Sequence, residues 1–191
     1  MRQLHGSYTS PYVRHCRIAL LAGGLDFEFV ETVAGQSASP TGRVPFLVEG
    51  DLQLSDSTSI LRHIRLLLAE PFLPTAQQAD TYCLANTVLD AAISLFLFER
   101  LDGLLPEKSK YLRRQSDRVQ AGLVELEARN ISTEFPLSDA ALRVVCLAAW
   151  GSYRRRFDLS EFPRLQRLVE SARRAAPFRA TEPPAGATLP A

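Results

Sequence analysis

Two polar pairs in this sequence, Ser10–Pro11 and Asp56–Ser57, have the residue types needed to hold an anion at the start of a helix. Ser10 is a preferred N-cap residue, and Pro11 suits the first helical position because its missing N–H has no partner there. A hydroxyl at a helix N-terminus lies beside unpaired N–H donors and positive dipole charge, which together stabilise negative charge. Plain helix capping is the simpler interpretation of both pairs, and the pattern alone leaves both uses open.

A third motif, Val44–Pro45, precedes an apolar, strand-like run over residues 46–49. Proline inside a strand removes a backbone donor, and it therefore belongs at a sheet edge, a bulge or a cis turn. A simple entry from a loop into the strand is the alternative interpretation.

Apolar periodicity predicts the elements that position these motifs. In the first 70 residues the predicted elements, in chain order, are a strand over 4–8, a helix over 10–22, strands over 27–32, 46–49 and 52–54, and a helix over 57–69. The first strand, helix and second strand form a βαβ unit, whose two strands should be parallel.

A proline-containing linker over residues 70–74 separates this part from a helical remainder. The predicted helices of that remainder are 75–101, 110–129, 139–153 and 162–175. The helix over 139–153 is apolar on nearly all sides, as expected at the centre of a domain, and Ser138 is its predicted cap. The last part of residues 181–191 is predicted to be loose, because it has three prolines and few anchors.

Taken in chain order, the motifs at Ser10, Val44–Pro45 and Asp56–Ser57 resemble those of the cytosolic glutathione S-transferase family, particularly its bacterial serine-type members. The likeness includes residues 7–14 (SYTSPYVR) and, less closely, residues 179–184 (RATEPP). The resemblance implies an α/β thioredoxin-like N-terminal domain over residues 1–70. It also implies an all-α C-terminal domain over residues 75–191, which contributes the pocket for an electrophile.

By this resemblance, Ser10 is the catalytic residue: it contacts the sulfur of glutathione and keeps it as a thiolate, without itself becoming a nucleophile. Tyr8 and Thr9 stay open as alternative sulfur contacts. A cis turn at Val44–Pro45 pairs with the cysteinyl backbone of glutathione.

By the same resemblance, Asp56 and Ser57 bind the γ-glutamyl end of glutathione. The family usually has a further helix before the third strand, but only residues 33–42 are available here. A loop or single turn must replace that helix, and Arg43 is the nearest cation for the glycyl carboxylate.

Bulk properties exclude several other classes of function. The net charge of +1, with 46% hydrophobic and 23% charged residues, indicates a globular protein without general attraction to nucleic acid or acidic membranes. The three histidines share no metal-ligand spacing, so no metal is predicted. The three cysteines, Cys16, Cys83 and Cys146, are predicted to be buried and reduced, and none forms a Cys-x-x-Cys pair. The chain shows no signal core and no apolar run near the ~18 residues of a membrane span, which predicts a cytoplasmic protein.

The predicted reaction is attack of glutathione, as co-substrate, on a small hydrophobic electrophile, catalysed by a homodimer. A glutathione-dependent peroxidase or disulfide reductase at the same site is one alternative, and a non-catalytic interaction module is another. Phe96, Phe98, Trp150 and Tyr153 fit either an electrophile pocket or core packing. The arginines at 154–156 are interpreted as a solvated helix end.

Overall fold

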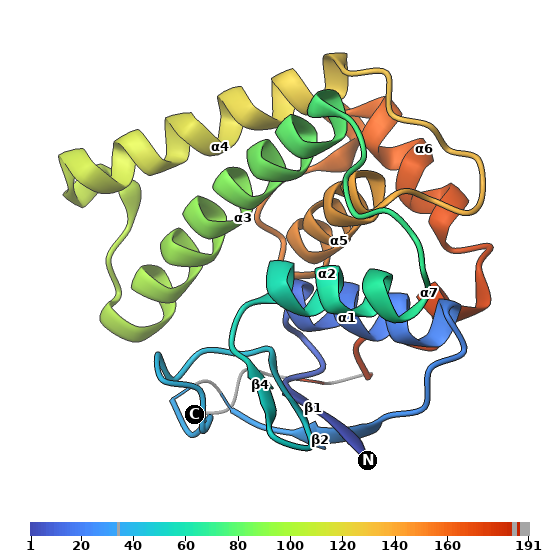
Figure 1. Cartoon of the computed structure of the whole chain (residues 1–191). Coiled ribbons are helices and arrows are strands. Elements are labelled where there is room, and N and C mark those ends of the chain that lie inside the picture. Colours follow the sequence, from blue (N-terminus) through green and yellow to red (C-terminus); the bar gives the residue numbers. More distant parts are fainter. Residues whose placement is uncertain (34, 185–186, 188–191) are drawn as a thin grey trace. The chain divides into compact units, whose positions relative to one another are not determined.

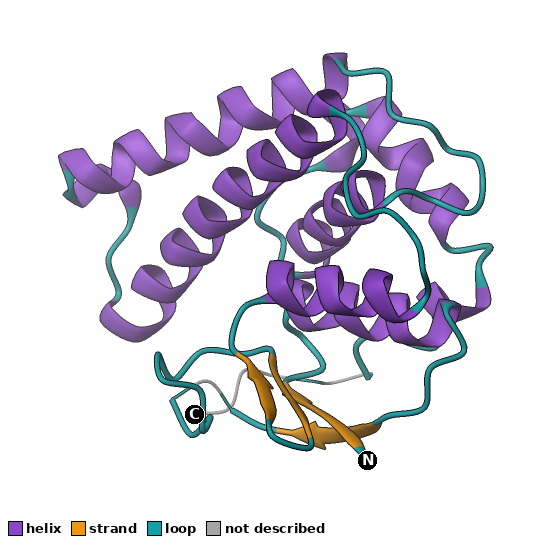
Figure 2. Cartoon of the chain, in the orientation of Figure 1, coloured by secondary structure: helices purple, strands orange, loops and turns teal. Residues whose placement is uncertain are grey.

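The computed structural model describes residues 1–33, 35–184 and 187, and these residues form two compact units. Unit 1 combines residues 1–72 with those from 173 onward, and unit 2 spans Leu73–Ala172. All the strands described belong to unit 1, as Figure 2 shows. The last described residues therefore share most of their contacts with the N-terminal part of the chain.

Unit 1 is built on a four-stranded sheet with the strand order β2-β1-β3-β4. The strands are β1 (Arg2–Gly6), β2 (Glu28–Glu31), β3 (Phe46–Glu49) and β4 (Leu52–Leu54). The β1–β2 pair is parallel, which confirms the predicted βαβ unit, and the other two pairs are antiparallel. β1 begins and ends two residues earlier than predicted. The reason is that Arg2 and Gln3 pair with neighbouring strands through their backbones, whereas Tyr8 lies in a turn.

The helices of unit 1 are α1 (Pro11–Ala22), α2 (Ser57–Leu67) and the short α7 (Ala176–Arg179). Figure 1 shows α1 and α2 side by side against one face of the sheet. The periodicity did not indicate α7, which packs against α1. The largest fully buried apolar side chains between these layers are Leu4, Leu20, Leu47, Ile60, Leu61 and Ile64.

Unit 2 is helical. Its α-helices are α3 (Ala76–Asp102), α4 (Lys110–Ala128), α5 (Asp139–Tyr153) and α6 (Pro163–Ala172), and its short 3₁₀ turns are η1 (Pro106–Lys108) and η2 (Leu159–Glu161). α3 packs against both α4 and α5, and α6 packs against the same two helices. The helix α3 is long and apolar enough to cross a membrane. Its length and composition are weak evidence for a membrane span, because the core helix of a globular protein can have the same length and composition.

The two features predicted for the central helix are confirmed. α5 is buried along its length as far as Gly151, and the Ser138 hydroxyl accepts a hydrogen bond from the Ala141 amide at 3.2 Å. The prediction that all three cysteines are buried is wrong for Cys83, which is exposed. Cys83 lies outside the buried stripe of α3 that contains Tyr82, Ala85 and Leu89.

Candidate functional site

The three motifs lie at the same end of the unit 1 sheet, next to the ends of β1, β3 and β4. In the β1–β3 pair, His5 lies opposite Phe46, so the end of β1 meets the start of β3. In the β3–β4 pair, Leu47 lies opposite Leu54, so β4 ends at the same edge. The segments that continue from these strand ends lead to Ser10, to Pro45 and to Asp56. The topology therefore brings Ser10 to the same end of the sheet as Pro45 and Asp56, which follow it by 35 and 46 residues in the sequence.

Ser10 is the N-cap of α1, as predicted. Its hydroxyl oxygen accepts a hydrogen bond from the Val13 amide at 3.3 Å, and its carbonyl accepts one from the Arg14 amide at 2.9 Å. The Ser10 amide donates to the Ser7 carbonyl at 3.2 Å, which fixes the turn before the helix. A serine hydroxyl that accepts one hydrogen bond still has its own proton to donate. Ser10 is half-buried, and its hydroxyl can therefore serve a ligand and the helix at once.

A close contact between β1 and α1 sets the position of this cap. A Cβ atom at Gly6 would lie 2.4 Å from Cγ2 of Val13, whose amide donates to Ser10. Only glycine allows the end of the strand to approach the first turn of the helix this closely.

Tyr8 and Thr9 lie in the turn between β1 and α1. The Tyr8 ring contacts the Phe29 ring with 4.8 Å between centroids, and the Arg17 guanidinium lies 4.9 Å from the Tyr8 centroid. Thr9 is buried, with 7% of its surface exposed. These packing contacts distinguish both residues from Ser10, which stands at the helix start itself.

The Val44–Pro45 peptide bond is cis, as the family resemblance implied. Pro45 is buried and Val44 is half-buried, directly before β3. Arg43 is exposed at the end of the segment that replaces the usual helix. The described residues of 33–42 form turns and bends, in agreement with the predicted loop.

Asp56 is the N-cap of α2, and its carboxylate accepts a hydrogen bond from the Thr58 amide at 2.7 Å. Ser57 begins the helix and is buried, with 4% of its surface exposed. The Ser57 carbonyl lies 3.9 Å from Sγ of Cys16, so α1 contacts the start of α2. The exposed Asp56 carboxylate has further acceptor positions that could take an ammonium group.

Arg14 and Arg17 lie one turn apart on α1, a pattern that by itself indicates a basic edge of the helix. Both side chains are buried, with 7% and 9% of their surfaces exposed. Burial lowers the pKa of the Arg17 guanidinium; Tyr8 raises this pKa and Arg14 lowers it further. A helical pattern shows which residues share a face but not which distant segment covers that face. The resemblance of residues 179–184 (RATEPP) to the family was the sequence signal that could have indicated this covering segment.

The aromatic residues of unit 2 lie around an arginine. Phe96 and Trp150 meet edge to face with 5.9 Å between centroids, and Arg154 lies 5.2 Å from the Phe96 centroid and 4.9 Å from that of Tyr153. Nε and Nη2 of Arg154 are buried without a hydrogen-bond partner among the described residues. The interpretation of residues 154–156 as a solvated helix end is therefore wrong for Arg154, because the aromatic rings exclude water from its guanidinium.

Comparison with known proteins bears on the fold that positions these residues. Residues 4–71 match the family model described as "Glutathione S-transferase, N-terminal domain". The GST-like protein YibF of Escherichia coli K12, named as uncharacterized, is 27% identical over 201 residues, which cover 95% of this chain and 98% of YibF. Residues 4–71 thus match the N-terminal domain of the glutathione S-transferase family, and the whole chain is similar to proteins named for that family.

Two further similar proteins are informative. A "probable maleylacetoacetate isomerase" of Vibrio cholerae is 26% identical over 158 residues, which cover 76% of this chain and 73% of that protein. A glutathione S-transferase from Methylobacterium radiotolerans, solved in complex with glutathione sulfonate, has a TM-score of 0.83 at 24% identity and covers 100% of this chain and 98% of that chain. This likeness confirms the predicted fold, a thioredoxin-like domain followed by helices.

Proposed function

We propose that this protein is a glutathione transferase that joins the sulfur of glutathione to small hydrophobic electrophiles. The observation that carries the proposal is the Ser10 hydroxyl at the N-terminus of α1, at the sheet edge where Pro45 and Asp56 also lie. None of the first four residues of α1 (PYVR) is acidic, so the first turn itself contains no carboxylate. A thiolate from a ligand suits that position.

The energies involved are of the right size. A free thiol has a pKa of about 8.5, and only a few per cent is thiolate at neutral pH. Lowering that pKa by about two units requires about 2.7 kcal/mol of preferential stabilisation of the anion. A hydrogen bond to an ionised group contributes about 1.5–3 kcal/mol, and a helix N-terminus about 0.3–1 kcal/mol. The Ser10 hydroxyl and the start of α1 together are sufficient.

The remaining residues orient glutathione in this proposal. Val44 and Pro45 present backbone groups to the cysteinyl unit, Ser57 and the start of α2 bind the γ-glutamyl carboxylate, and Asp56 accepts from the ammonium group. Arg43 pairs with the glycyl carboxylate. We further propose that the enzyme is a cytoplasmic homodimer whose helical domain supplies the electrophile pocket.

Two serine caps provide a matched experiment. Ser10→Ala and Ser138→Ala remove the same kind of cap, and each should cost about 1 kcal/mol of unfolding free energy. The ultraviolet absorbance of bound glutathione thiolate, followed against pH, should give a thiol pKa about 1–2 units higher in Ser10→Ala than in the wild type. Ser138→Ala should leave that pKa unchanged.

Two results would contradict this proposal. A calorimetric titration without binding at millimolar glutathione would favour a non-catalytic interaction module. An unchanged thiolate titration in Ser10→Ala would remove Ser10 from its role and return attention to Tyr8 and Thr9.

The relative named as a probable maleylacetoacetate isomerase supports a second candidate function at the same site. In this second function, the glutathione thiolate would add to one carbon of a conjugated cis double bond. The remaining single bond would rotate, and the thiolate would leave again. Two substrates separate these functions. Conjugation to a chloro-nitroarene would consume glutathione, whereas isomerisation of a cis-alkene acid would not. A hydroperoxide tests the redox alternative, since its reduction to an alcohol and water converts two glutathione molecules into the disulfide.

A further inference from the structure

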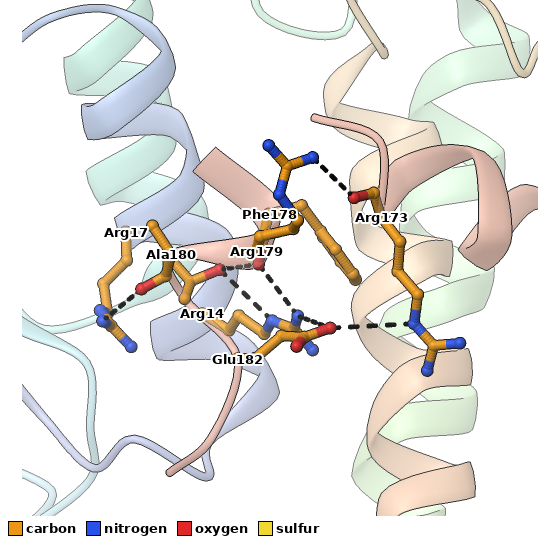
Figure 3. A network of polar contacts seen from close by, with 8 residues as sticks. Arg14, Arg17, Arg173, Phe178, Arg179, Ala180 and Glu182 are labelled. Carbon is orange, nitrogen blue, oxygen red and sulfur yellow. Dashed lines mark hydrogen bonds and ion pairs between the residues drawn. The ribbon is translucent and has the colours of Figure 1, made fainter. Parts of the chain in front are cut away.

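Residues 178–182 of unit 1, which comprise the end of α7 and the turn after it, contact α1 through an arginine one turn after Ser10. Nη2 of Arg14 donates to the Phe178 carbonyl at 3.2 Å, and Nε donates to the Thr181 hydroxyl at 3.4 Å. Nη2 also lies 4.0 Å from a carboxylate oxygen of Glu182. Figure 3 shows Phe178 and Glu182 beside the Arg14 guanidinium.

The contact between Arg14 and residues 178–181 is buried. The Arg14 guanidinium lies 3.9 Å from the centroid of the Phe178 ring. Phe178 and Thr181 are 1% and 0% exposed, and the Thr181 hydroxyl donates to the Phe178 carbonyl at 2.9 Å. A buried guanidinium that loses its acceptors is left with an unsatisfied charge, so the contact is strongly favoured over separation.

A second arginine connects the same segment to the turn that precedes Ser10. Nη2 of Arg17 donates to the Ala180 carbonyl at 3.4 Å, as Figure 3 also shows. The Arg17 guanidinium lies 4.9 Å and 4.7 Å from the ring centroids of Tyr8 and Phe29. Arg17 therefore joins residues 178–182 to the Tyr8 turn and to β2 at once.

We infer that residues 178–182, here called the C-terminal clasp, fix the position of the Ser10 hydroxyl, with Arg14 and Arg17 as positioning residues. This inference rests on the proposed function. Ser10 lies between the two points that the clasp holds, the Tyr8 turn and the first turn of α1. A hydrogen bond weakens steeply as its angle departs from linearity, so a small displacement of this cap weakens its bond to the thiolate.

The outer part of the clasp is an ion pair. Glu182 lies between Arg14, at 4.0 Å, and Nε of Arg173, at 3.8 Å. The Glu182 side chain is about half exposed, and such pairs contribute little. The buried contacts of Thr181 and Phe178 are therefore the part to test.

The chain offers a matched pair of threonines for that test. The Thr181 hydroxyl accepts from Arg14, and the Thr81 hydroxyl in unit 2 accepts from Nη1 of Arg129 at 2.8 Å. Both threonines are buried, and valine preserves their shape. Thr181→Val should raise the pKa of the bound glutathione thiol by about 0.5–1 pH unit, because the donor to the thiolate is displaced. Thr81→Val should leave this pKa unchanged.

Arg14→Lys separates position from charge, since lysine keeps the charge and loses the planar fork. The clasp requires that this variant also raises the thiol pKa. A wild-type titration in both Thr181→Val and Arg14→Lys would overturn the inference, as would an equal shift in Thr81→Val.

Amide hydrogen exchange in the full-length protein without glutathione tests the clasp independently of the proposed function. Thr181→Val should speed exchange at the Val13 and Arg14 amides at least several-fold, and Thr81→Val should not. If exchange rises but Ser10→Ala leaves the thiol pKa unchanged, the proposed role of Ser10 fails and the inferred positioning fails with it, although the contact itself exists. If Ser10→Ala shifts the pKa while neither the exchange nor the pKa responds to Thr181→Val, only the clasp fails.

Discussion

Helices α1 and α5 have the same type of cap, and their first turns differ in charge. Ser10 accepts from the Val13 amide at 3.3 Å, and Ser138 accepts from the Ala141 amide at 3.2 Å. The first turn of α5 contains the buried Asp139, whereas the first four residues of α1 (PYVR) include no acid. Because a carboxylate compensates the positive end of a helix, the first turn of α5 contains a counter-charge and the first turn of α1 does not.

The comparison teaches that a serine cap becomes a candidate site through its surroundings. Both serines are half-buried and both lead into helices buried along most of their length. The hydroxyl chemistry is identical in both places. What differs is that Ser10 lies at the end of the sheet that also holds Pro45 and Asp56, and that its helix has no acid in the first turn.

The largest expected effect comes from Gly6, which positions α1. Gly6→Ala would place a methyl group 2.4 Å from Val13 and should cost about 1–3 kcal/mol of unfolding free energy. Urea denaturation measures this loss, and calorimetry should show weaker glutathione binding. Gly6→Ala combined with Val13→Ala should lose less than the sum of the single losses, since the smaller side chain removes the clash. Strictly additive losses would contradict the proposed clash.

Removing the counter-charge of α5 should have a smaller effect and one confined to stability. Asp139→Asn keeps the shape and should lower the unfolding free energy by about 1–2 kcal/mol, because the charge at the helix N-terminus is lost. The thiol pKa of bound glutathione should stay at the wild-type value. A shift of that pKa would show that the two helix starts are not independent.

Giving α1 a counter-charge of its own should make it resemble α5. Tyr12→Glu places a carboxylate in the first turn beside the proposed thiolate, and the repulsion should raise the thiol pKa by about 0.2–0.7 unit. Tyr12→Gln is the neutral control for the lost ring. Equal thiolate titrations of the two variants would argue against a thiolate at this helix end.

The smallest effect concerns the other end of β3. The hydrogen bond from His63 at 2.9 Å, followed by the contacts with Arg2, holds the pKa of the Glu49 carboxyl below its ordinary value. A carboxyl with a lowered folded-state pKa stabilises the fold above its unfolded pKa, and this contribution disappears as the pH falls through the folded value. Glu49→Gln should therefore cost less than about 1 kcal/mol near pH 6, since Glu49 is partly exposed, and nothing in strong acid. Urea denaturation at both pH values checks this, and the thiolate titration should not change.

Local patterns predicted the parts of the fold that depend on neighbouring residues. Ser10 and Ser138 cap their helices as their types indicate, and the bounds of α5 match the apolar pattern residue for residue. The parallel pairing of β1 and β2 followed from the βαβ order.

The features that escaped prediction depend on contacts between distant segments. Arg14 is buried because residues 178–182 cover it, and α-helical periodicity carries no information about that segment. Cys83 has apolar neighbours in sequence and is exposed because neither α4 nor α5 covers its side of α3. The prediction of a loose end for residues 181–191 concerns mainly residues outside those described, whereas Thr181 itself is held by Arg14.

The bond between Arg14 and Phe178 also orders events during synthesis. The Phe178 carbonyl is translated 164 residues after its arginine partner, so the contact forms only after β1 to β4 and α3 to α6 have been synthesised. A chain that stops short of Phe178 therefore leaves the Arg14 guanidinium without this acceptor. Residues 178–182 thus complete the surroundings of Ser10, which is made long before them.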